Sequence, residues 1–267
     1  MKTIKREKYL NELIRVKGTP DIKVITGIRR SGKSKLLESF IDYLKVNDKK
    51  ANIIYVDFNS LENEELQDYH SLHTYVLDKY LKSKNNYLFI DEIQNCNGFE
   101  KAINSLHSKE MFDIYITGSN AFLLSSDLAT LFTGRTYSIE VFPFSFNEYL
   151  QYYKYKDKYK AFDLYLNEGG MAGSYIHKDL KDKYKYIKEV YDTLVLRDII
   201  QKNKIKKTVI VISISKITSF TYLCLCFSKP IKNLSITKTI AKNIIKLYLL
   251  NIFDTKLFIK STTKIAS

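Results

Sequence analysis

Eight consecutive residues near the start of the chain have types and spacing suited to phosphate binding. The run Gly27-Ile28-Arg29-Arg30-Ser31-Gly32-Lys33-Ser34 follows an apolar segment and precedes a helix-like one. Gly27 and Gly32 would let the backbone come close enough to wrap a phosphate with its N–H groups. Lys33 would reach the β- and γ-phosphates, and Ser34 would offer its hydroxyl to Mg²⁺. This Walker A pattern predicts a nucleoside triphosphate site, and the alternative is a tight turn that caps a helix.

A second stretch supplies two carboxylates. The apolar run Tyr87-Leu88-Phe89-Ile90 leads directly into Asp91 and Glu92, which is a Walker B arrangement. Ligands of parallel α/β sheets lie at the carboxyl ends of the strands. Asp91 is therefore predicted to hold Mg²⁺ through water, and Glu92 to orient and deprotonate the attacking water. The alternative is a strand that enters solvent through acidic residues, but a strand between Lys33 and Asp91 favours the functional interpretation.

Three further polar residues are candidates for contact with the γ-phosphate. Ser119 and Asn120 follow an expected strand at 112–117, and either could equally cap the helix-like segment that comes next. Arg135 precedes the last expected strand. It is predicted to act as an arginine finger, in its own subunit or in a neighbour's, and the alternative is a surface arginine that pairs with a helix end.

Strands and helices must position these residues, and the apolar patterns indicate where they lie. Five strands are predicted, at 22–26, 51–58, 87–90, 112–117 and 136–142. The near-continuous apolar run 51–58 is typical of a parallel strand covered on both faces. A leading helix is expected to start with Thr3 as its cap and to end at Gly18. After Pro143 the pattern is helical and rich in tyrosine, and we expect these tyrosines to pack helices rather than to stack on bases.

The composition excludes several classes of protein. The chain has 267 residues, of which 45% are hydrophobic and 27% charged, as in ordinary globular domains. Three cysteines are too few for a disulfide framework, which favours a reducing, cytoplasmic location, and the amino terminus lacks the apolar core of a signal peptide. A membrane span over 209–227 is disfavoured, because Lys216 near its middle would cost roughly 2.5–3.5 kcal/mol.

The formal net charge of +14 is concentrated at one end of the chain. Residues 199–267 contain 13 lysines, no arginine and a single acidic residue, which gives them +12. Residues 1–198 contain 30 basic and 28 acidic residues and carry only +2. The part with the candidate site is nearly neutral, so the global charge does not indicate that it binds DNA.

Taken together, the motifs resemble those of the AAA-type ATPases of archaea and bacteria that carry a C-terminal domain of unknown function. The resemblance covers about residues 1–205. It implies an α/β fold, a three-layer P-loop NTPase of the ASCE/AAA type with a parallel sheet in the order 5-1-4-3-2, followed by a small helical region. It also implies ATP and Mg²⁺ as cofactors, and it alone suggests a homo-oligomer and a nucleic-acid partner. Ala172 departs from the family, where proline usually follows Gly-Gly-Met. The matching segments are 24–34, 88–94, 116–120, 134–135, 142–146 and 169–171.

We expect three parts: an ATPase domain at 1–145, a helical region at 146–205 and an atypical basic tail at 206–267. Glycine is absent after Gly173, and acidic residues nearly vanish beyond Lys204. Members of the family continue into winged-helix-like and nuclease-like modules, which the tail does not resemble. We hypothesise that the tail is an out-of-frame or degenerate end, and a disordered segment is the alternative.

The function predicted from these features is Mg-dependent ATP hydrolysis coupled to movement of the helical region or of a partner. One alternative is an ATP-dependent switch or adaptor with negligible turnover, and another is a truncated, non-functional member of the family. A GTPase is disfavoured because the chain lacks the Asn-Lys-x-Asp signature. A small-molecule kinase is disfavoured by the Asp91-Glu92 pair.

Overall fold

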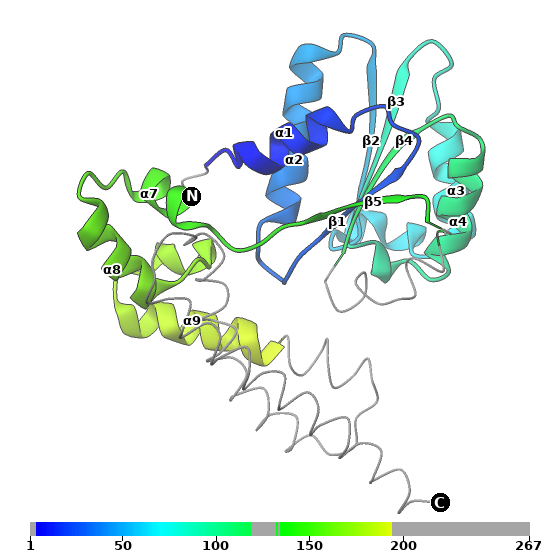
Figure 1. Ribbon diagram of the computed structural model, residues 1–267. Helices are drawn as coiled ribbons and strands as arrows, with labels where there is room; N and C mark the ends of the chain where they lie inside the picture. The colour runs from blue at the N-terminus through cyan, green and yellow to red at the C-terminus, as the bar shows by residue number, and fades with distance from the viewer. Residues whose placement is uncertain (1–3, 119–131, 133, 194–267) are drawn as a thin grey trace, which may run out of the picture. The chain divides into compact units, whose positions relative to one another are not determined.

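The computed structural model describes residues 4–118, 132 and 134–193, and a five-stranded sheet lies at its centre (Figure 1). The strands lie in the order β2-β3-β4-β1-β5, and all neighbouring pairs are parallel. This confirms the predicted order 5-1-4-3-2. The bounds are β1 (Ile22–Thr26), β2 (Ala51–Asp57), β3 (Asn85–Asp91), β4 (Asp113–Thr117) and β5 (Thr136–Glu140).

Helices cover both faces of the sheet, which makes three layers (Figure 1). Side chains alternate between the faces of a strand, so neighbouring residues of β1 enter different cores. Val24 packs with α3 (Tyr69–Asp78) and α4 (Phe99–Ser108), whereas Ile25 packs with α1 (Glu7–Arg15) and α2 (Lys33–Asn47). All five residues of β1 are buried, as expected for a parallel strand between two helical layers. Two short 3-10 helices, η1 (Leu61–Leu66) and η2 (Ile93–Asn95), complete this part.

The register of the strands brings three chain segments to one edge of the sheet. Ile25 lies opposite Thr117, the last residue of β4, and Ile90 lies opposite Ile116. The carboxyl ends of β1, β3 and β4 are therefore level with one another. The candidate loop after β1 and the acidic residues at the end of β3 are neighbours for this reason.

A small helical region follows β5, with α7 (Phe146–Tyr153), α8 (Lys158–Glu168), η3 (Ala172–Ile176) and α9 (Leu180–Thr193). Tyr149 is fully buried, and its ring centroid lies 5.2 Å from that of Tyr165 and 5.5 Å from that of Tyr175. The Lys183 ammonium is 2.7 Å from the Glu168 carboxylate, in an ion pair that is almost entirely buried. These tyrosines pack helices together, as predicted.

The contact between η3 and α9 leaves no free space at Gly173. A Cβ atom built on this glycine would collide with the hydroxyl group of Tyr186, which is a residue of α9. The two elements approach each other this closely because residue 173 has no side chain.

The first helix starts later than predicted. Residues 4–6 are not helical, and α1 begins at Glu7 with Arg6 at its N-cap and no side-chain cap. The prediction of a helix that includes Ile4 is therefore wrong, and Thr3 lies outside the described residues. Arg6 makes contacts far from the helix instead, and these are described below.

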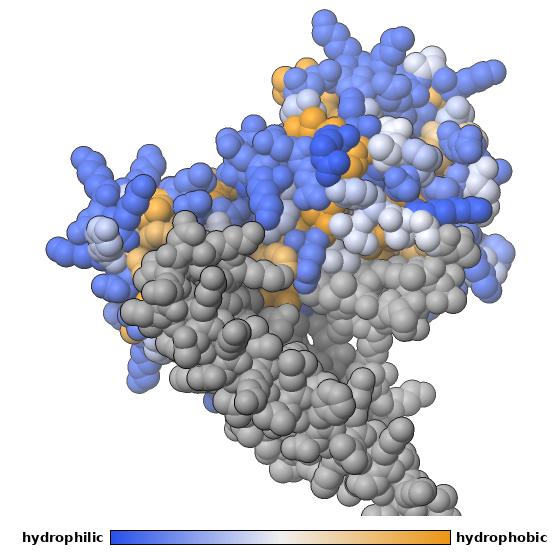
Figure 2. Space-filling model, viewed as in Figure 1, coloured by the Kyte–Doolittle hydropathy of each residue, from blue (hydrophilic) through white to orange (hydrophobic). Residues whose placement is uncertain are grey.

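The face in Figure 2 is mostly hydrophilic, with small hydrophobic areas between charged residues. Among the described residues, no helix is both long enough and apolar enough to cross a membrane. The predicted tail at 206–267, its apolar run 209–227 and the expected boundary near residue 205 lie outside those residues.

Candidate functional site

The loop between β1 and α2 turns sharply, because three of its residues have positive φ. The values are 150° at Gly27, 63° at Arg30 and 97° at Gly32. A Cβ atom at Gly27 would collide with the carbonyl oxygen of Val141 and would lie 2.9 Å from Ser31 Oγ. Glycine is therefore required at position 27 by the chain's own backbone. The predicted Walker A residues form a compact loop beside the end of β5.

Lys33 lies inside this loop. Its side chain is 4% exposed, and Nζ donates hydrogen bonds to the carbonyl oxygens of Gly27, at 3.1 Å, and of Ile28, at 3.3 Å. Lys33 is also the first residue of α2, whose N-cap, Gly32, provides no side-chain cap. A helix N-terminus carries partial positive charge on its unpaired N–H groups. Together with the buried ammonium, it creates a site with affinity for an anion.

Ile28 and Arg29 are half-buried, whereas Arg30 is exposed. The guanidinium carbon of Arg30 lies 4.9 Å from the centroid of the Tyr186 ring on α9. A cation over an aromatic face is attracted to it. The loop is thus in contact with the helical region on this side.

The predicted metal ligands Ser34 and Asp91 are in contact. Asp91 ends β3, is 1% exposed and forms a side-chain hydrogen bond with Ser34. The Thr117 hydroxyl donates to Asp91 Oδ1 and accepts from the backbone N–H of Glu92 at 3.0 Å. Tyr55, on β2, also forms a side-chain hydrogen bond with Asp91. Hydroxyl groups from the first turn of α2 and from two neighbouring strands therefore surround this carboxylate.

The environment of Asp91 disfavours its charge. Burial is the main cause that raises the pKa of this carboxyl, and the nearby carboxylates of Glu92 and Asp57 raise it further. The hydrogen bonds with Ser34 and Thr117 oppose these effects. A divalent cation at this position would stabilise the ionised form.

Glu92 has an unusual backbone conformation, with φ 57° and ψ 51° in the left-handed region. It lies directly after β3, and its carboxylate Oε2 accepts a hydrogen bond from Nε2 of Gln94. The other end of the Gln94 amide, Oε1, is buried and has no hydrogen-bond partner among the described residues. The left-handed backbone of Glu92 is strained. Strain of this kind is tolerated where the surrounding structure fixes a residue, often at a functional site.

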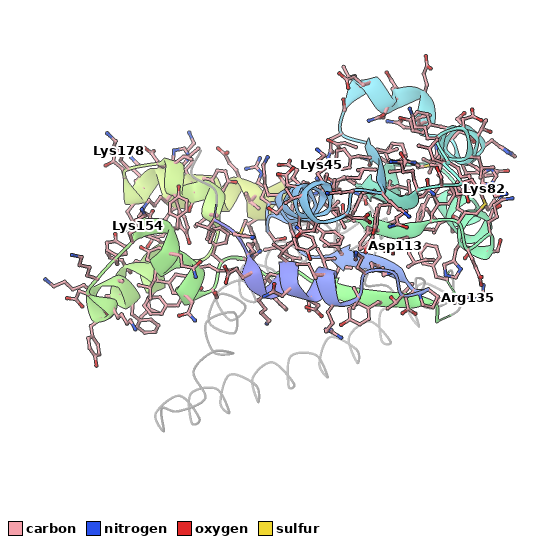
Figure 3. The ribbon with its side chains drawn as sticks, turned by 90° about the horizontal axis from the view of Figure 1, so that it is seen from above. Lys45, Lys82, Asp113, Arg135, Lys154 and Lys178 are labelled. Carbon is pink, nitrogen blue, oxygen red and sulfur yellow. The ribbon has the colours of Figure 1, made fainter. Side chains whose placement is uncertain are left out.

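Arg135 lies at the opposite edge of the sheet. It directly precedes β5, and its carbonyl oxygen accepts from the N–H of Ile22, the first residue of β1. The loop begins after Thr26, so the length of β1, roughly 16 Å, separates it from Arg135. In Figure 3, Arg135 lies on the side of the view away from Lys154 and Lys178, which belong to the helical part. This position is too far from the loop for Arg135 to reach the phosphates of its own subunit, so a finger for a neighbouring subunit or a surface arginine are the interpretations that fit it. Ser119 and Asn120 lie outside the described residues.

A cavity of about 550 Å³ lies beside the loop. Its polar lining includes Arg6, Lys33, Ser34 and Glu92, and its aromatic lining comes from the helical part and the segment before it. Ligand pockets of roughly 300–1,000 Å³ commonly hold small molecules and cofactors. The aromatic lining residues are Phe144, Tyr152 and Tyr186.

Sequence reasoning missed two residues at this site. Thr117 is fully buried and joins Asp91 to Glu92, whereas the polar residues considered were those just after it. A polar residue that ends an otherwise apolar strand could have indicated its role. Arg6 lines the cavity and donates to the Ser31 carbonyl oxygen. It is one of many basic residues, and nothing in the pattern distinguished it.

Comparison with known proteins agrees with this geometry. A family model described as an AAA domain matches residues 19–150. An uncharacterized protein of Haemophilus influenzae is 38% identical over 216 residues, which cover 79% of this chain and 54% of that protein. An uncharacterized protein of Methanocaldococcus jannaschii is 32% identical over 216 residues, covering 76% of this chain and 47% of that one. The chain spans about half the length of these curated relatives.

Solved structures to which the chain is similar include the following three. The Aeropyrum pernix ORC1 protein in complex with DNA has a TM-score of 0.45 and 10% identity, over 72% of this chain and 67% of that one. Domain III of the Thermotoga maritima replication initiation protein DnaA has a TM-score of 0.45 and 18% identity, over 68% and 90%. The Hsp104–ADP complex of S. cerevisiae has a TM-score of 0.46 and 17% identity, over 57% and 24%.

The sheet order and the match over residues 19–150 therefore agree on one family. Residues 19–150 of this chain are therefore an AAA domain with the fold of a P-loop ATPase.

Proposed function

We propose that this chain binds ATP with Mg²⁺ and hydrolyses it to ADP and phosphate. The observation that carries the proposal is the contact between Ser34 and Asp91, next to the buried Lys33 ammonium. It joins a phosphate-binding loop to a carboxylate at the neighbouring end of β3. An anion and a cation would both find ligands there.

The residues have distinct roles in this proposal. Lys33 and the backbone N–H groups of residues 27–34 bind the phosphate oxygens. Ser34 and Asp91 would hold Mg²⁺, which when bound neutralises charge on those oxygens. The Glu92 carboxylate accepts a proton from the attacking water while Gln94 holds its Oε2. Asn120 remains a predicted contact of the γ-phosphate or of that water.

Three features of the site fit these ligands. The pKa of Asp91 is raised by burial, so a cation would relieve the cost of its ionised form. Ser31 Oγ, in the loop, is buried without a hydrogen-bond partner among the described residues. The cavity of about 550 Å³ offers aromatic side chains next to the loop, and an aromatic ring can stack on a base.

The test compares nucleotide affinity and steady-state hydrolysis of the wild-type chain with those of Lys33→Ala and Glu92→Gln. Lys33→Ala is expected to weaken MgATP binding strongly, because the ammonium lies inside the loop. Glu92→Gln is expected to bind MgATP with little change but to lower kcat by about 10²-fold or more, since it removes the general base. Equal kcat for wild type and Glu92→Gln would exclude Glu92 as the base. Tight binding without turnover in the wild type would favour the switch or adaptor.

The proposal extends to Arg135 and to assembly. Arg135 is exposed and lies at the edge of the sheet opposite the loop. An arginine in this position serves as a finger only for a neighbouring subunit. A homo-oligomer is therefore part of the proposal. The role in trans would be supported if Arg135→Ala lowered kcat at concentrations where the chain assembles and left the rate of the dilute monomer unchanged.

Other parts of the proposal rest on the sequence. They are a division at residues 145 and 205, a cytoplasmic location, a nucleic-acid partner suggested by resemblance alone, and the use of hydrolysis to move the helical region or a partner. The Arg30–Tyr186 contact supports the last of these, because it joins the loop to α9.

A further inference from the structure

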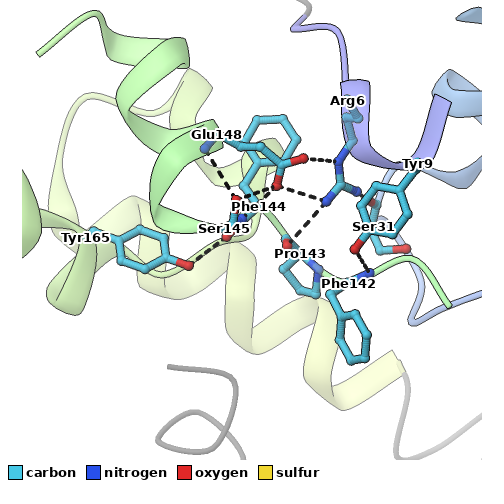
Figure 4. Close-up of polar contacts among 9 residues, drawn as sticks. All are labelled: Arg6, Tyr9, Ser31, Phe142, Pro143, Phe144, Ser145, Glu148 and Tyr165. Carbon is cyan, nitrogen blue, oxygen red and sulfur yellow. Dashed lines mark hydrogen bonds and ion pairs between the residues drawn. The ribbon is translucent and has the colours of Figure 1, made fainter. Parts of the chain in front are cut away.

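The guanidinium group of Arg6 lies between the loop and the start of α7 (Figure 4). It precedes α1, and the side chain is 6% exposed. Nη1 donates to the carbonyl oxygen of Ser31 at 2.9 Å. Nε and Nη2 donate to the two carboxylate oxygens of Glu148, at 2.7 and 3.1 Å, and Nη2 also reaches the carbonyl oxygen of Pro143 at 3.5 Å. One planar side chain thus contacts three separate segments.

The contact with Ser31 fixes a peptide group of the loop. A peptide bond is planar and trans, so its C=O and N–H groups point in opposite directions. When Arg6 holds the Ser31 carbonyl, the N–H of Gly32 is directed away from Arg6. Gly32 has φ 97°, and glycine rotates easily between backbone conformations. The bond from Arg6 therefore selects one orientation of the Ser31–Gly32 peptide.

The contact with Glu148 makes the orientation of the Ser31–Gly32 peptide depend on the position of α7. Glu148 completes a capping box: its Oε2 accepts from the N–H of Ser145 at 2.8 Å and from the Ser145 hydroxyl at 3.0 Å. The carboxylate is therefore fixed to the first turn of α7. Since it is 14% exposed and Arg6 is 6% exposed, neither charge can be solvated fully without separating the two parts. A displacement of α7 would withdraw the carboxylate from Arg6.

Two aromatic rings keep the guanidinium plane in place. Its central carbon lies 4.5 Å from the centroid of the Tyr9 ring and 5.3 Å from that of Phe144. Tyr9 also accepts a hydrogen bond from the backbone N–H of Phe142, at 3.2 Å (Figure 4). Arginine is suited to this position, because a flat group with five donors can stack and make a bidentate ion pair at the same time.

We propose that Arg6 is a positioning residue of the nucleotide site, which holds the Ser31–Gly32 peptide for phosphate binding and makes its orientation depend on the place of α7 through Glu148. The inference rests on the proposed function, because it assumes that the loop binds a phosphate. Coupling between two sites is reciprocal. MgATP binding should therefore favour the docked position of α7, and the docked position should favour MgATP.

The test is a double-mutant cycle on the full chain with Arg6→Lys and Glu148→Gln, with the Kd for MgATP as readout. Arg6→Lys is expected to raise Kd by about tenfold, since the single nitrogen of lysine cannot replace three guanidinium nitrogens that bond both oxygens of Glu148 and the Ser31 carbonyl. Glu148→Gln is expected to raise Kd by about threefold, although Glu148 belongs to α7. The double variant should match Arg6→Lys alone, because both changes break one connection.

The ion pair between Lys183 and Glu168 provides a matched control. It is as short, at 2.7 Å, and as buried, with 6% and 12% exposure, but it lies within the helical part. Glu168→Gln should lower thermal stability as Glu148→Gln does and leave Kd unchanged. Equal effects of the two variants on Kd would mean that Glu148 acts through general stability, and this would overturn the coupling.

The remaining outcomes also decide the matter. If Arg6→Lys weakens binding and Glu148→Gln does not, Arg6 acts on the nucleotide alone and the coupling is refuted. If Arg6→Lys does not fold, the comparison of Glu148→Gln with Glu168→Gln decides by itself. If wild type binds MgATP and all variants bind it equally, the inference fails while the proposed function stands. Absence of MgATP binding by the wild type would instead refute the proposed function.

Discussion

Buried charges have different partners at the two ends of the strands of the central sheet. We call these ends the amino edge and the carboxyl edge. At the amino edge, the Lys23 ammonium is fully buried, lies 2.6 Å from Asp113 Oδ1 and donates to the Thr19 carbonyl oxygen at 2.5 Å. Asp113 Oδ2 accepts from the Tyr115 hydroxyl at 2.9 Å and from the Gly18 N–H at 2.8 Å. Each of these two buried charges has an opposite charge and further hydrogen bonds within the chain.

At the carboxyl edge, carboxylates gather instead. Asp91 is hydrogen-bonded to neutral hydroxyl groups, and the nearby charges of Glu92 and Asp57 raise its pKa. The difference separates two purposes of buried charge. The amino edge is complete without a ligand and contributes to the fold, whereas the carboxyl edge would gain stability from a cation.

The largest expected effect is loss of stability at the amino edge. Asp113→Asn leaves the Lys23 ammonium buried without its carboxylate, which should lower the free energy of unfolding by about 3–5 kcal/mol. Chemical denaturation measures the change. The double variant Lys23→Met/Asp113→Leu removes both charges and should be far less destabilised. A loss below about 1 kcal/mol in Asp113→Asn would remove the contrast between the edges.

Asp91→Asn should have the opposite effect on the chain without nucleotide. Removal of a buried carboxylate near two others should raise the free energy of unfolding, because the desolvation cost disappears. Saturation with MgATP at 100 times Kd should stabilise the wild type by about 2.7 kcal/mol, and Asp91→Asn should lose most of this gain. Thermal unfolding with and without MgATP measures both effects. Destabilisation of the ligand-free variant would mean that Asp91 is a structural residue like Asp113.

Thr117→Val tests the hydroxyl that joins Asp91 to Glu92. The substitution keeps the shape but leaves the Glu92 N–H without its acceptor, which should cost about 1–3 kcal/mol in stability. It should also lower kcat more than it raises KM, since Glu92 would lose its fixed position. Thr26→Val is the matched control at the end of β1, because Thr26 Oγ1 is buried and has no partner among the described residues. Equal losses of kcat in the two variants would contradict the role of Thr117.

The smallest effect concerns Cys96, which is buried near the carboxyl edge but outside the site. Burial raises the pKa of this thiol to about 12, and the thiolate is the reactive form. In a Cys224→Ser/Cys226→Ser background, we expect almost no alkylation of the folded chain between pH 7 and pH 9, and full alkylation in denaturant. Rapid alkylation of the folded chain would show that the carboxyl edge opens far enough to expose the Cys96 thiol.

The sequence predicted the residues at the carboxyl edge better than their connections. The glycine, lysine and carboxylate pattern indicates phosphate chemistry by type and spacing, so the loop and Asp91 could be located. The sheet order came from family resemblance, because no local pattern determines which strands are neighbours. Thr117 was not predicted as a site residue, because its role depends on the register of β3 and β4.

Arg6 and Arg135 show where local patterns have no information. The first helix was expected to begin near Thr3, but the chain before Glu7 is not helical, and Arg6 contacts residues 25 and 142 positions away. Arg135 could be assigned to one edge only after the pairing of β1 with β5 was known. Both depend on contacts between distant parts of the chain, which periodicity and propensity do not encode.

The missing side chain at Gly173 has an evolutionary consequence. The Tyr186 hydroxyl occupies the volume that any larger residue at 173 would need, so a change at 173 requires the Tyr186 ring to move or a smaller residue to replace it. In related sequences, alanine or serine at position 173 should therefore occur together with a smaller residue at 186, and this smaller residue would also release Arg30 from its aromatic partner. Covariation between positions 173 and 186 should thus extend to position 30, in the loop itself.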